Sequence, residues 1–176
     1  EVKFGFPAWW IQKLREECPV RWEEVVAAEN RHPPMTLRVN RRRTTLGEYL
    51  ECLAAAGIEA RALGEMAVRV DPRPVSEIPG FAQGLASVQD AGAQWAARLL
   101  DVSDGQRVLD ACAAPGGKTG HLLELAELDV LALDNDPARL GRIAENLGRL
   151  GLQARVECAD AGQPGQWWDG RPFQRI

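Results

Sequence analysis

The second half of the chain alternates short apolar runs with amphipathic segments, and this alternation restricts the possible folds more than any other feature. Three apolar runs have the length of buried strands and two segments between them have helical spacing: 107–113, 129–134 and 154–160, with 118–126 and 137–151. Pro137 suits the first turn of the second helix, and Gly151 suits its end. Repeated strand–helix units predict an α/β fold with a parallel sheet covered by helices, and residues 173–176 are expected to begin a fourth strand.

The first half contains a smaller α/β pattern. Apolar spacing and turn residues predict two helices, a half-buried strand, a third helix and two short strands, in this order: 6–18, 20–31, 35–40, 44–57, 58–63 and 67–70. Thr45 and Glu48 have the spacing of a capping box at the third helix. Three prolines and two glycines in 71–86 favour a surface connection, and a further helix is expected near 90–100. The predicted parts are a helical region, a small α/β module, a connecting segment and the sheet region: 1–32, 33–72, 73–90 and 91–176.

Composition excludes several classes of protein. No apolar run is long enough to span a bilayer, so no membrane association is expected. The four cysteines form no CxxC pair and only two histidines accompany them, so we expect a reduced, cytoplasmic protein without a metal site. The net charge is −4: residues 1–80 carry 12 basic and 12 acidic side chains, and residues 81–176 carry 9 and 13.

This charge argues against a protein held on nucleic acid by its overall charge. The densest basic cluster consists of four arginines: Arg38, Arg41, Arg42 and Arg43. Guanidinium groups suit phosphate oxygens, so the cluster is either a phosphate-binding surface or an ordinary solvated one.

A glycine-rich turn follows the first predicted strand of the second half. Gly116 and Gly117 allow unusual backbone dihedrals and a close approach of a ligand. Asp134 ends the next strand, 24 residues after Asp110, which is close to the separation at which a carboxylate binds ribose hydroxyls. Asp160 ends the third strand, at the same edge of the sheet. The alternative is that these are only turn residues.

The turn does not match either common phosphate-binding pattern. Gly117-Lys118-Thr119 ends like a P-loop, but Cys112 stands where its first glycine belongs. The dinucleotide pattern G-x-G-x-x-G also fails, because Gly116 and Gly117 are adjacent. An adenosine site without a phosphate cradle remains, and S-adenosyl-L-methionine, with its positive sulfonium, suits the surrounding carboxylates. A degenerate P-loop nucleoside triphosphatase is the competing interpretation.

Several motifs together resemble a known family. DACAAPGGKT at 110–119, ALDND at 132–136 and CAD at 158–160 are similar to those of the cytosine-C5 RNA methyltransferases of the RsmB/Fmu/Sun type, bacterial enzymes that modify 16S ribosomal RNA. PPMTLRVN at 33–40 and the segment from IPGF to VQDAGAQ resemble the same family. The resemblance implies a Rossmann-like S-adenosylmethionine-dependent methyltransferase domain preceded by a small RRM-like RNA-facing module.

The resemblance also implies roles for individual residues. The methionine and sulfonium part of S-adenosyl-L-methionine would be lined by Cys112, Ala113, Ala114, Pro115, Gly116, Gly117 and Lys118. Asp134 would bind the ribose hydroxyls, Asp160 would lie beside the adenine, and the arginine cluster would lie near ribosomal RNA. Gln89 and Asp90 match a pair in the family, but the sequence suggests no physical role for them.

The expected chemistry needs a thiolate that adds to C6 of cytosine and makes C5 nucleophilic. In the family this cysteine lies in a Thr-Cys-Ser motif after a later strand, and an N-terminal NusB-like helical domain precedes the RNA-facing module. We expect both outside these 176 residues, so that the chain alone is inactive. Cys112 is expected to be a packed small residue, and Cys18 and Cys52 are expected to be structural. A monomeric full-length enzyme acting on 16S ribosomal RNA is expected; the alternative is a non-catalytic RNA- or cofactor-binding module.

Overall fold

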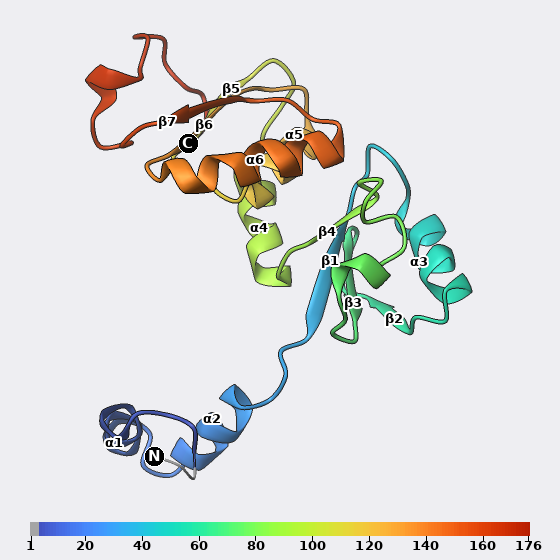
Figure 1. Ribbon diagram of the computed structural model, residues 1–176, viewed down its shortest axis with the longest axis vertical. Helices are drawn as coiled ribbons and strands as arrows, with labels where there is room; N and C mark the ends of the chain where they lie inside the picture. Colours follow the sequence, from blue (N-terminus) through green and yellow to red (C-terminus); the bar gives the residue numbers. More distant parts are fainter. Residues whose placement is uncertain (1–3) are drawn as a thin grey trace. The chain divides into compact units, whose positions relative to one another are not determined.

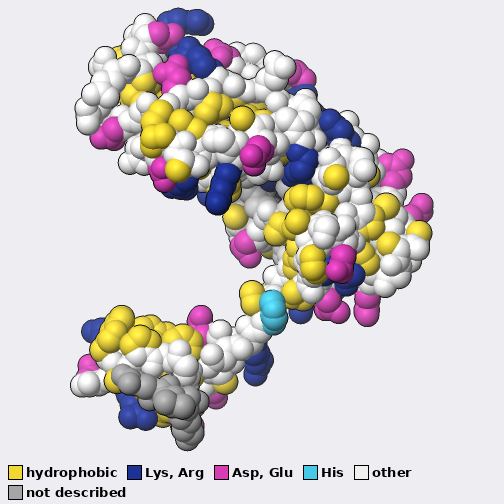
Figure 2. All heavy atoms as spheres, in the orientation of Figure 1, with side chains coloured by type: hydrophobic (Ala, Val, Ile, Leu, Met, Phe, Trp, Pro, Cys, Tyr) yellow, Lys and Arg dark blue, Asp and Glu magenta, His cyan; other side chains and the backbone are white. Residues whose placement is uncertain are grey.

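The structure is a computed structural model that describes residues 4–176, and it divides into two compact units, Glu1–Pro34 and Met35–Ile176 (Figure 1). The first three residues of the predicted helical region 1–32 lie outside the described residues. The first unit contains α1 (Ala8–Glu17) and α2 (Trp22–Glu29), which confirms the two expected helices. Ile11 and Val26 are buried, whereas Trp9 is exposed, and Figure 2 shows hydrophobic side chains on the surface of this unit.

The second unit begins with a four-stranded antiparallel sheet. Its elements are β1 (Met35–Val39), α3 (Leu46–Ala55), β2 (Ala60–Ala62), β3 (Ala67–Val70) and β4 (Ala86–Val88). The strand order is β2-β3-β1-β4, and α3 lies on one face of the sheet (Figure 1). Leu37 and Val39 of β1 pack with Tyr49 and Leu53 of α3 in its core. The expected capping box is confirmed, because the Thr45 side chain accepts from the Glu48 N–H and the Glu48 carboxylate accepts from the Thr45 N–H.

The prediction that residues 73–90 only connect two parts of the chain is wrong in part, because these residues include strand β4. This strand pairs with β1 in the register Leu37↔Val88 and Val39↔Ala86. A short 3-10 helix, η1 (Val75–Glu77), precedes it, and Ile78 is buried in the same core. Three residues are too few for strand periodicity to be visible among the flanking prolines and glycines. The four-stranded sheet therefore extends beyond residue 72, to Val88.

Strand β1 also differs from its predicted half-buried character. The apolar face carries Leu37 and Val39, but Thr36, Arg38 and Asn40 on the opposite side are buried as well. Alternating polar residues normally indicate a solvated face. Here the polar face is covered by the helices that follow, and α4 contacts β1 directly.

A parallel sheet forms the second half of this unit, as predicted. Its elements are α4 (Ala91–Leu99), β5 (Arg107–Asp110), α5 (Gly117–Leu125), β6 (Asp129–Asp134), α6 (Pro137–Leu150), β7 (Arg155–Cys158) and the 3-10 helix η2 (Pro164–Gln166). The strand order is β5-β6-β7. The expected start of a fourth strand is confirmed on the free edge of β5, where Arg175 forms a parallel bridge with Val108. Its carbonyl accepts from the Leu109 N–H at 3.0 Å.

Strand β6 is buried on both faces, which is typical of the centre of a parallel sheet. Val130 and Ala132 pack with residues of α4, α5 and α6 on one face. Leu131 and Leu133 lie on the other face, in a cluster that includes Trp167 among its partly buried members. Within residues 4–176, no helix is both long enough and apolar enough to cross a membrane.

Candidate functional site

The candidate site lies at the carboxyl edge of the parallel sheet, where ligands bind in open α/β folds. Asp110 ends β5 and Asp134 ends β6, while Asp160 follows β7 after one residue. The register pairs Asp134 with Cys158 on β7. The structure therefore brings together the acidic strand ends that the sequence predicted.

The turn between β5 and α5 is fixed by its backbone, and we call it the cofactor loop (111–117) after the role that the sequence predicts for it. The Ala113 N–H donates to the Leu133 carbonyl at 2.8 Å, and the Gly116 N–H donates to the Ala113 carbonyl at 2.6 Å. Gly116 has a φ of +92°, and a Cβ there would lie 3.2 Å from the Cα of Ile143. Glycine is therefore required both by the backbone conformation and by the close approach of α6.

Asp134 forms the floor of this loop. It is 2% exposed. One carboxylate oxygen accepts from the Ala114 N–H at 3.0 Å and the other from the Asp136 N–H at 3.1 Å. The Arg139 guanidinium lies 3.7 Å from the same carboxylate. Each oxygen has a second lone pair, so the group can still accept from hydroxyls.

The loop carbonyls are held by side chains that the sequence analysis did not single out for this role. Ala114, Pro115 and Gly117 each accept one side-chain hydrogen bond: from Arg139 Nη2 at 2.9 Å, from Asn146 Nδ2 at 3.1 Å and from Arg38 Nη1 at 2.9 Å. Arg139 and Asn146 both lie on α6, seven residues apart, which places them on the same face of the helix. This spacing is the only feature of the sequence that could have indicated their contacts with the loop. Arg38 lies on β1, and no local sequence signal connects it with residue 117.

The other two acidic residues differ in their surroundings. Asp110 accepts from the Thr119 hydroxyl at 2.6 Å, which ties the end of β5 to the start of α5. Asp160 is exposed and accepts from the Gly162 N–H at 2.9 Å. The Trp167 indole N–H donates to the Asp160 carbonyl at 3.0 Å, while Trp168 is 46% exposed. Trp167 thus supports the segment after β7.

This donor set suits an adenosine with a positive group better than a polyphosphate. In a P-loop the backbone N–H groups bind phosphate oxygens. Here the Ala114 N–H is bound by the Asp134 carboxylate, whose charge would repel a phosphate. Cys112, expected to be packed, is instead exposed at the start of the loop, so that prediction is wrong. Lys118 is also exposed, on the first turn of α5.

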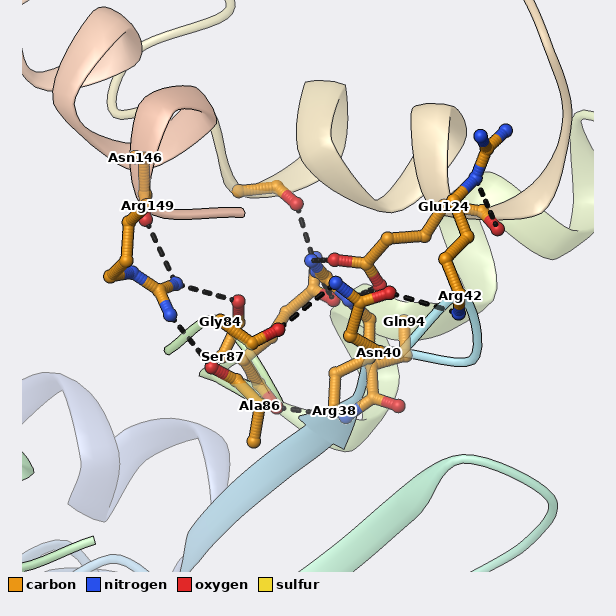
Figure 3. Close-up of polar contacts among 12 residues, drawn as sticks. Arg38, Asn40, Arg42, Gly84, Ala86, Ser87, Gln94, Glu124, Asn146 and Arg149 are labelled. Carbon is orange, nitrogen blue, oxygen red and sulfur yellow. Dashed lines mark hydrogen bonds and ion pairs between the residues drawn. The ribbon is translucent and has the colours of Figure 1, made fainter. Parts of the chain in front are cut away.

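The arginine cluster does not form one surface. Arg38 is 1% exposed, so the prediction that it faces RNA is wrong. Its guanidinium forms two hydrogen bonds with the Glu124 carboxylate, at 2.9 and 2.7 Å (Figure 3). Arg42 donates to the Glu124 carbonyl at 3.3 Å and pairs with Glu127, two residues after the end of α5. Local sequence does not distinguish Arg38 from its neighbours, because its partner lies 86 residues away.

Arg43 and Arg41 are both exposed. Arg43 donates to the Gln83 carbonyl at 2.7 Å, so its guanidinium is held against the chain before β4. Arg41 has no hydrogen bond or ion pair to another side chain among the described residues. Among the described residues of the cluster, Arg41 is the arginine whose whole guanidinium is free to contact a ligand, while Arg42 and Arg43 have part of theirs bound to protein.

The structure gives physical roles to Gln89 and Asp90. Gln89 is buried, and its side-chain oxygen accepts from Arg38 Nη1 at 2.6 Å. Asp90 caps α4 by accepting from the Gly92 N–H at 2.8 Å. The two residues therefore join β4 to α4 and to the buried arginine.

His121, on α5, is fully buried, and neither ring nitrogen has a hydrogen-bond partner among the described side chains and backbone. Burial, together with the positive charges of Arg38 and Arg98, lowers the pKa of His121 to about 3. The ring is therefore neutral at physiological pH.

None of the four thiols hydrogen-bonds a His, Lys or Arg side chain within the described part of the chain. Cys18, Cys112 and Cys158 are exposed and Cys52 is partly buried. Cys18 was expected to be structural, but its side chain is exposed, so burial does not support that expectation. A nucleophilic thiol needs a neighbouring base or positive charge to become a thiolate, and hydrogen bonding supplies none here.

Comparison with known proteins assigns related families to both halves. A family model described as "Methyltr_RsmF/B-like, ferredoxin-like domain" matches residues 6–76, and one described as "16S rRNA methyltransferase RsmB/F" matches residues 97–176. The chain is 51% identical over 180 residues to ribosomal RNA small subunit methyltransferase B of Pseudomonas syringae pv. tomato, an alignment that covers 99% of this chain and 40% of that protein.

The protein of the same name from Vibrio cholerae is 47% identical, with 99% of this chain and 41% of that protein covered. The chain therefore spans about two fifths of the length of these relatives. The crystal structure of NSun6 from Pyrococcus horikoshii with SFG superposes with a TM-score of 0.81 at 16% identity, over 98% of this chain and 70% of that one. This likeness concerns the fold.

Proposed function

Since these matches show that the chain belongs to the RsmB/F family of 16S rRNA methyltransferases, we propose that it carries the cofactor site of an S-adenosylmethionine-dependent enzyme that methylates C5 of a cytosine in 16S ribosomal RNA. The observation that supports this most is the arrangement at the carboxyl edge. Asp134 is a buried carboxylate beneath the glycine-rich loop, and the Ala114 N–H of that loop donates to it. A negative group at this position favours the binding of a cation and of hydroxyls over the binding of phosphates. Ribosomal RNA as substrate implies action in the cytoplasm.

The residues present fit S-adenosyl-L-methionine. Asp134 would accept from the ribose hydroxyls, the exposed Asp160 would lie beside the adenine, and residues 112–118 would line the methionine and sulfonium part. When bound, this cofactor supplies a methyl group on a positive sulfur. SFG, present in the NSun6 structure, is an analogue of it. Arg139 and Asn146 hold the loop in place through its carbonyls.

We propose that the four-stranded module, residues 35–88, is the part of the chain that faces the RNA. Arg41 is exposed and available to bind a phosphate. Arg42 and Arg43 each keep N–H groups beyond the ones that bind protein, because a guanidinium has five. Replacing Arg41, Arg42 and Arg43 together should weaken RNA binding and flatten its salt dependence, since each phosphate contact releases counterions. An unchanged salt dependence would remove the cluster from the RNA surface.

Methylation at C5 needs a thiol that adds to C6, because C5 of cytosine is a weak nucleophile. Among the described residues, no His, Lys or Arg side chain hydrogen-bonds the thiol of Cys112 or Cys158. We therefore propose that the 176 residues alone form no 5-methylcytosine, and that a thiol from another part of the full-length enzyme acts at this site. The target base must also leave its stack to reach the sheet edge.

Calorimetry with S-adenosyl-L-methionine tests the cofactor site. We expect Asp134→Asn to weaken binding at least tenfold, because the ribose hydroxyls lose a charged acceptor worth about 1.5–3 kcal/mol. The matched control is Asp129→Asn, at the opposite end of the same strand, which should bind like the parent. An unchanged affinity in Asp134→Asn would remove this residue from the site, and no binding by the parent would refute the cofactor assignment.

Mass spectrometry of nucleosides tests the reaction. Ribosomal RNA is incubated with methyl-labelled cofactor and either the 176-residue chain or a protein of the relatives' full length. We expect label in 5-methylcytidine only with the longer protein. Label on another atom would refute the position of methylation. Label on cytosine with the shorter chain would show that one of its own cysteines is the nucleophile, and binding without any transfer by either protein would favour a non-catalytic module.

A further inference from the structure

We infer that Arg38, on the four-stranded sheet, is a positioning residue for the cofactor loop on the other sheet. The inference rests on the proposed function, because it assumes that the loop binds the cofactor. It assigns to the RNA-facing module a direct part in the geometry of the cofactor site. It also explains why Arg38 is buried while the rest of its cluster is exposed.

The first observation is the set of partners around the Arg38 guanidinium. The Glu124 carboxylate accepts from Nε and Nη2, which fixes the plane of the group. The Gln89 side-chain oxygen and the Gly117 carbonyl both accept from Nη1, at 2.6 and 2.9 Å. Both side chains of the Arg38–Glu124 pair are at most 1% exposed. A buried fork of this kind holds its direction far better than an exposed arginine.

The second observation is where the fork points. Gly117 is the first residue of α5, and its carbonyl shares a rigid peptide plane with the Lys118 N–H. That N–H is one of the first four of the helix, which have no partner within the helix. By holding the carbonyl, Arg38 fixes the direction of an amide donor at the ligand edge. Arg38 thus acts by orienting the backbone of the loop and not by contacting the cofactor itself.

A second, independent connection runs from β4 to the same loop. Arg149 on α6 donates to the Ser87 hydroxyl at 2.9 Å and to the Asn146 side-chain oxygen at 3.1 Å. Asn146 in turn donates to the Pro115 carbonyl at 3.1 Å. Arg149 also donates to the Ala86 carbonyl at 2.9 Å, so its own position depends on β4. Two strands of the RNA-facing module, the central β1 and the edge strand β4, are therefore linked to the loop that is proposed to bind the cofactor.

The test compares two buried arginines. In Arg38→Lys the positive charge stays, but the planar fork is lost, so the paired hydrogen bonds to Glu124 no longer fix the direction of the contact with the Gly117 carbonyl. Arg107→Lys is the matched control, because Arg107 is also buried and forms a fork with a carboxylate, Asp169, at the amino end of β5. Both changes should lower thermal stability.

Only Arg38→Lys should alter cofactor binding. We expect the affinity for S-adenosyl-L-methionine to fall about tenfold, which corresponds to about 1.4 kcal/mol, while Arg107→Lys binds like the parent. In the full-length enzyme, the KM for S-adenosyl-L-methionine should rise while kcat is kept. Binding of a 16S ribosomal RNA transcript should change less than about twofold, because Arg38 does not reach the surface. Asn146→Ala, a half-buried position on α6, should weaken cofactor binding in the same direction.

The outcomes separate this inference from the proposed function. If the parent protein binds no S-adenosyl-L-methionine, the proposed function fails. If the parent binds it and folded Arg38→Lys binds it equally well, the positioning role is refuted. Equal losses in Arg38→Lys and Arg107→Lys would also refute it, since a general loss of stability would then explain both. Should Arg38→Lys not fold, the double variant Arg38→Gln/Glu124→Gln, which leaves no unpaired buried charge, takes its place with the same expected loss.

Discussion

The burial of His121 predicts a pH-dependent loss of stability that can be isolated by one substitution. Its ring is fully buried, its nitrogens have no partner among the described residues, and its pKa is lowered to about 3. In the unfolded chain a histidine has a pKa of about 6.5. Between these two values the unfolded state binds a proton that the folded state refuses, so stability falls as the pH decreases.

The magnitude follows from the two pKa values. Above pH 6.5 the neutral ring costs the folded protein no stability through protonation. Below roughly pH 6 the free energy of unfolding falls by about 1.4 kcal/mol for each pH unit, until the pH reaches the pKa of His121 in the folded state. From pH 7 to pH 4.5 the loss is about 2.5 kcal/mol. His121→Leu has a similar volume and cannot be protonated. At pH 7 it should be at least as stable as the parent, because it buries no unpartnered nitrogen.

Urea denaturation followed by circular dichroism at pH 7, 6, 5 and 4.5 measures this effect. The parent and His121→Leu are compared at each pH, so the titration of carboxylates cancels in the difference. We expect the difference in unfolding free energy to shift in favour of the leucine variant by about 2.5 kcal/mol across the series. A difference that stays constant with pH would show that the folded protein accommodates the protonated ring, whose N–H groups then donate to an acceptor, and the reasoning would be wrong.

Three further predictions concern stability. Thr45→Ala should cost about 1 kcal/mol, seen as a lower urea midpoint, because the capping box of α3 is lost. Gly116→Ala should lower the thermal midpoint and weaken cofactor binding, since φ is +92° and the added Cβ would lie 3.2 Å from the Ile143 backbone. Arg107→Met should speed proteolytic cleavage within 169–173, because the fork that holds Asp169 is removed; an unchanged cleavage pattern would contradict this role.

The sequence predicted those features that local patterns determine. Apolar runs bounded by turn residues located all three strands of the parallel sheet, and the acidic residue that ends β6 was expected where Asp134 lies. The family resemblance supplied the cofactor loop, because its motif is contiguous in the chain.

The features that were missed depend on partners distant in sequence. Arg38 looks like any member of a basic cluster until Glu124 is placed beside it. Strand β4 is a strand because β1 offers it an edge, since three residues among turn formers carry no periodicity of their own. The burial of His121 is likewise decided by helix packing, which a single histidine in a helical segment does not reveal.

Burial of β1 on both faces bears on where such proteins can be recombined. Leu37 and Val39 belong to one core, while Arg38 on the same strand is hydrogen-bonded to Glu124 of α5, the helix that follows the first strand of the parallel sheet. A chimera that takes the four-stranded sheet from one homologue and the parallel sheet from another, joined in the proline-rich stretch before β4, would cut through both sets of contacts. The workable crossover lies at Pro34, the last residue of the first compact unit. To exchange substrate specificity within this family, the four-stranded sheet should therefore be transferred together with the residues that contact β1, and not by itself.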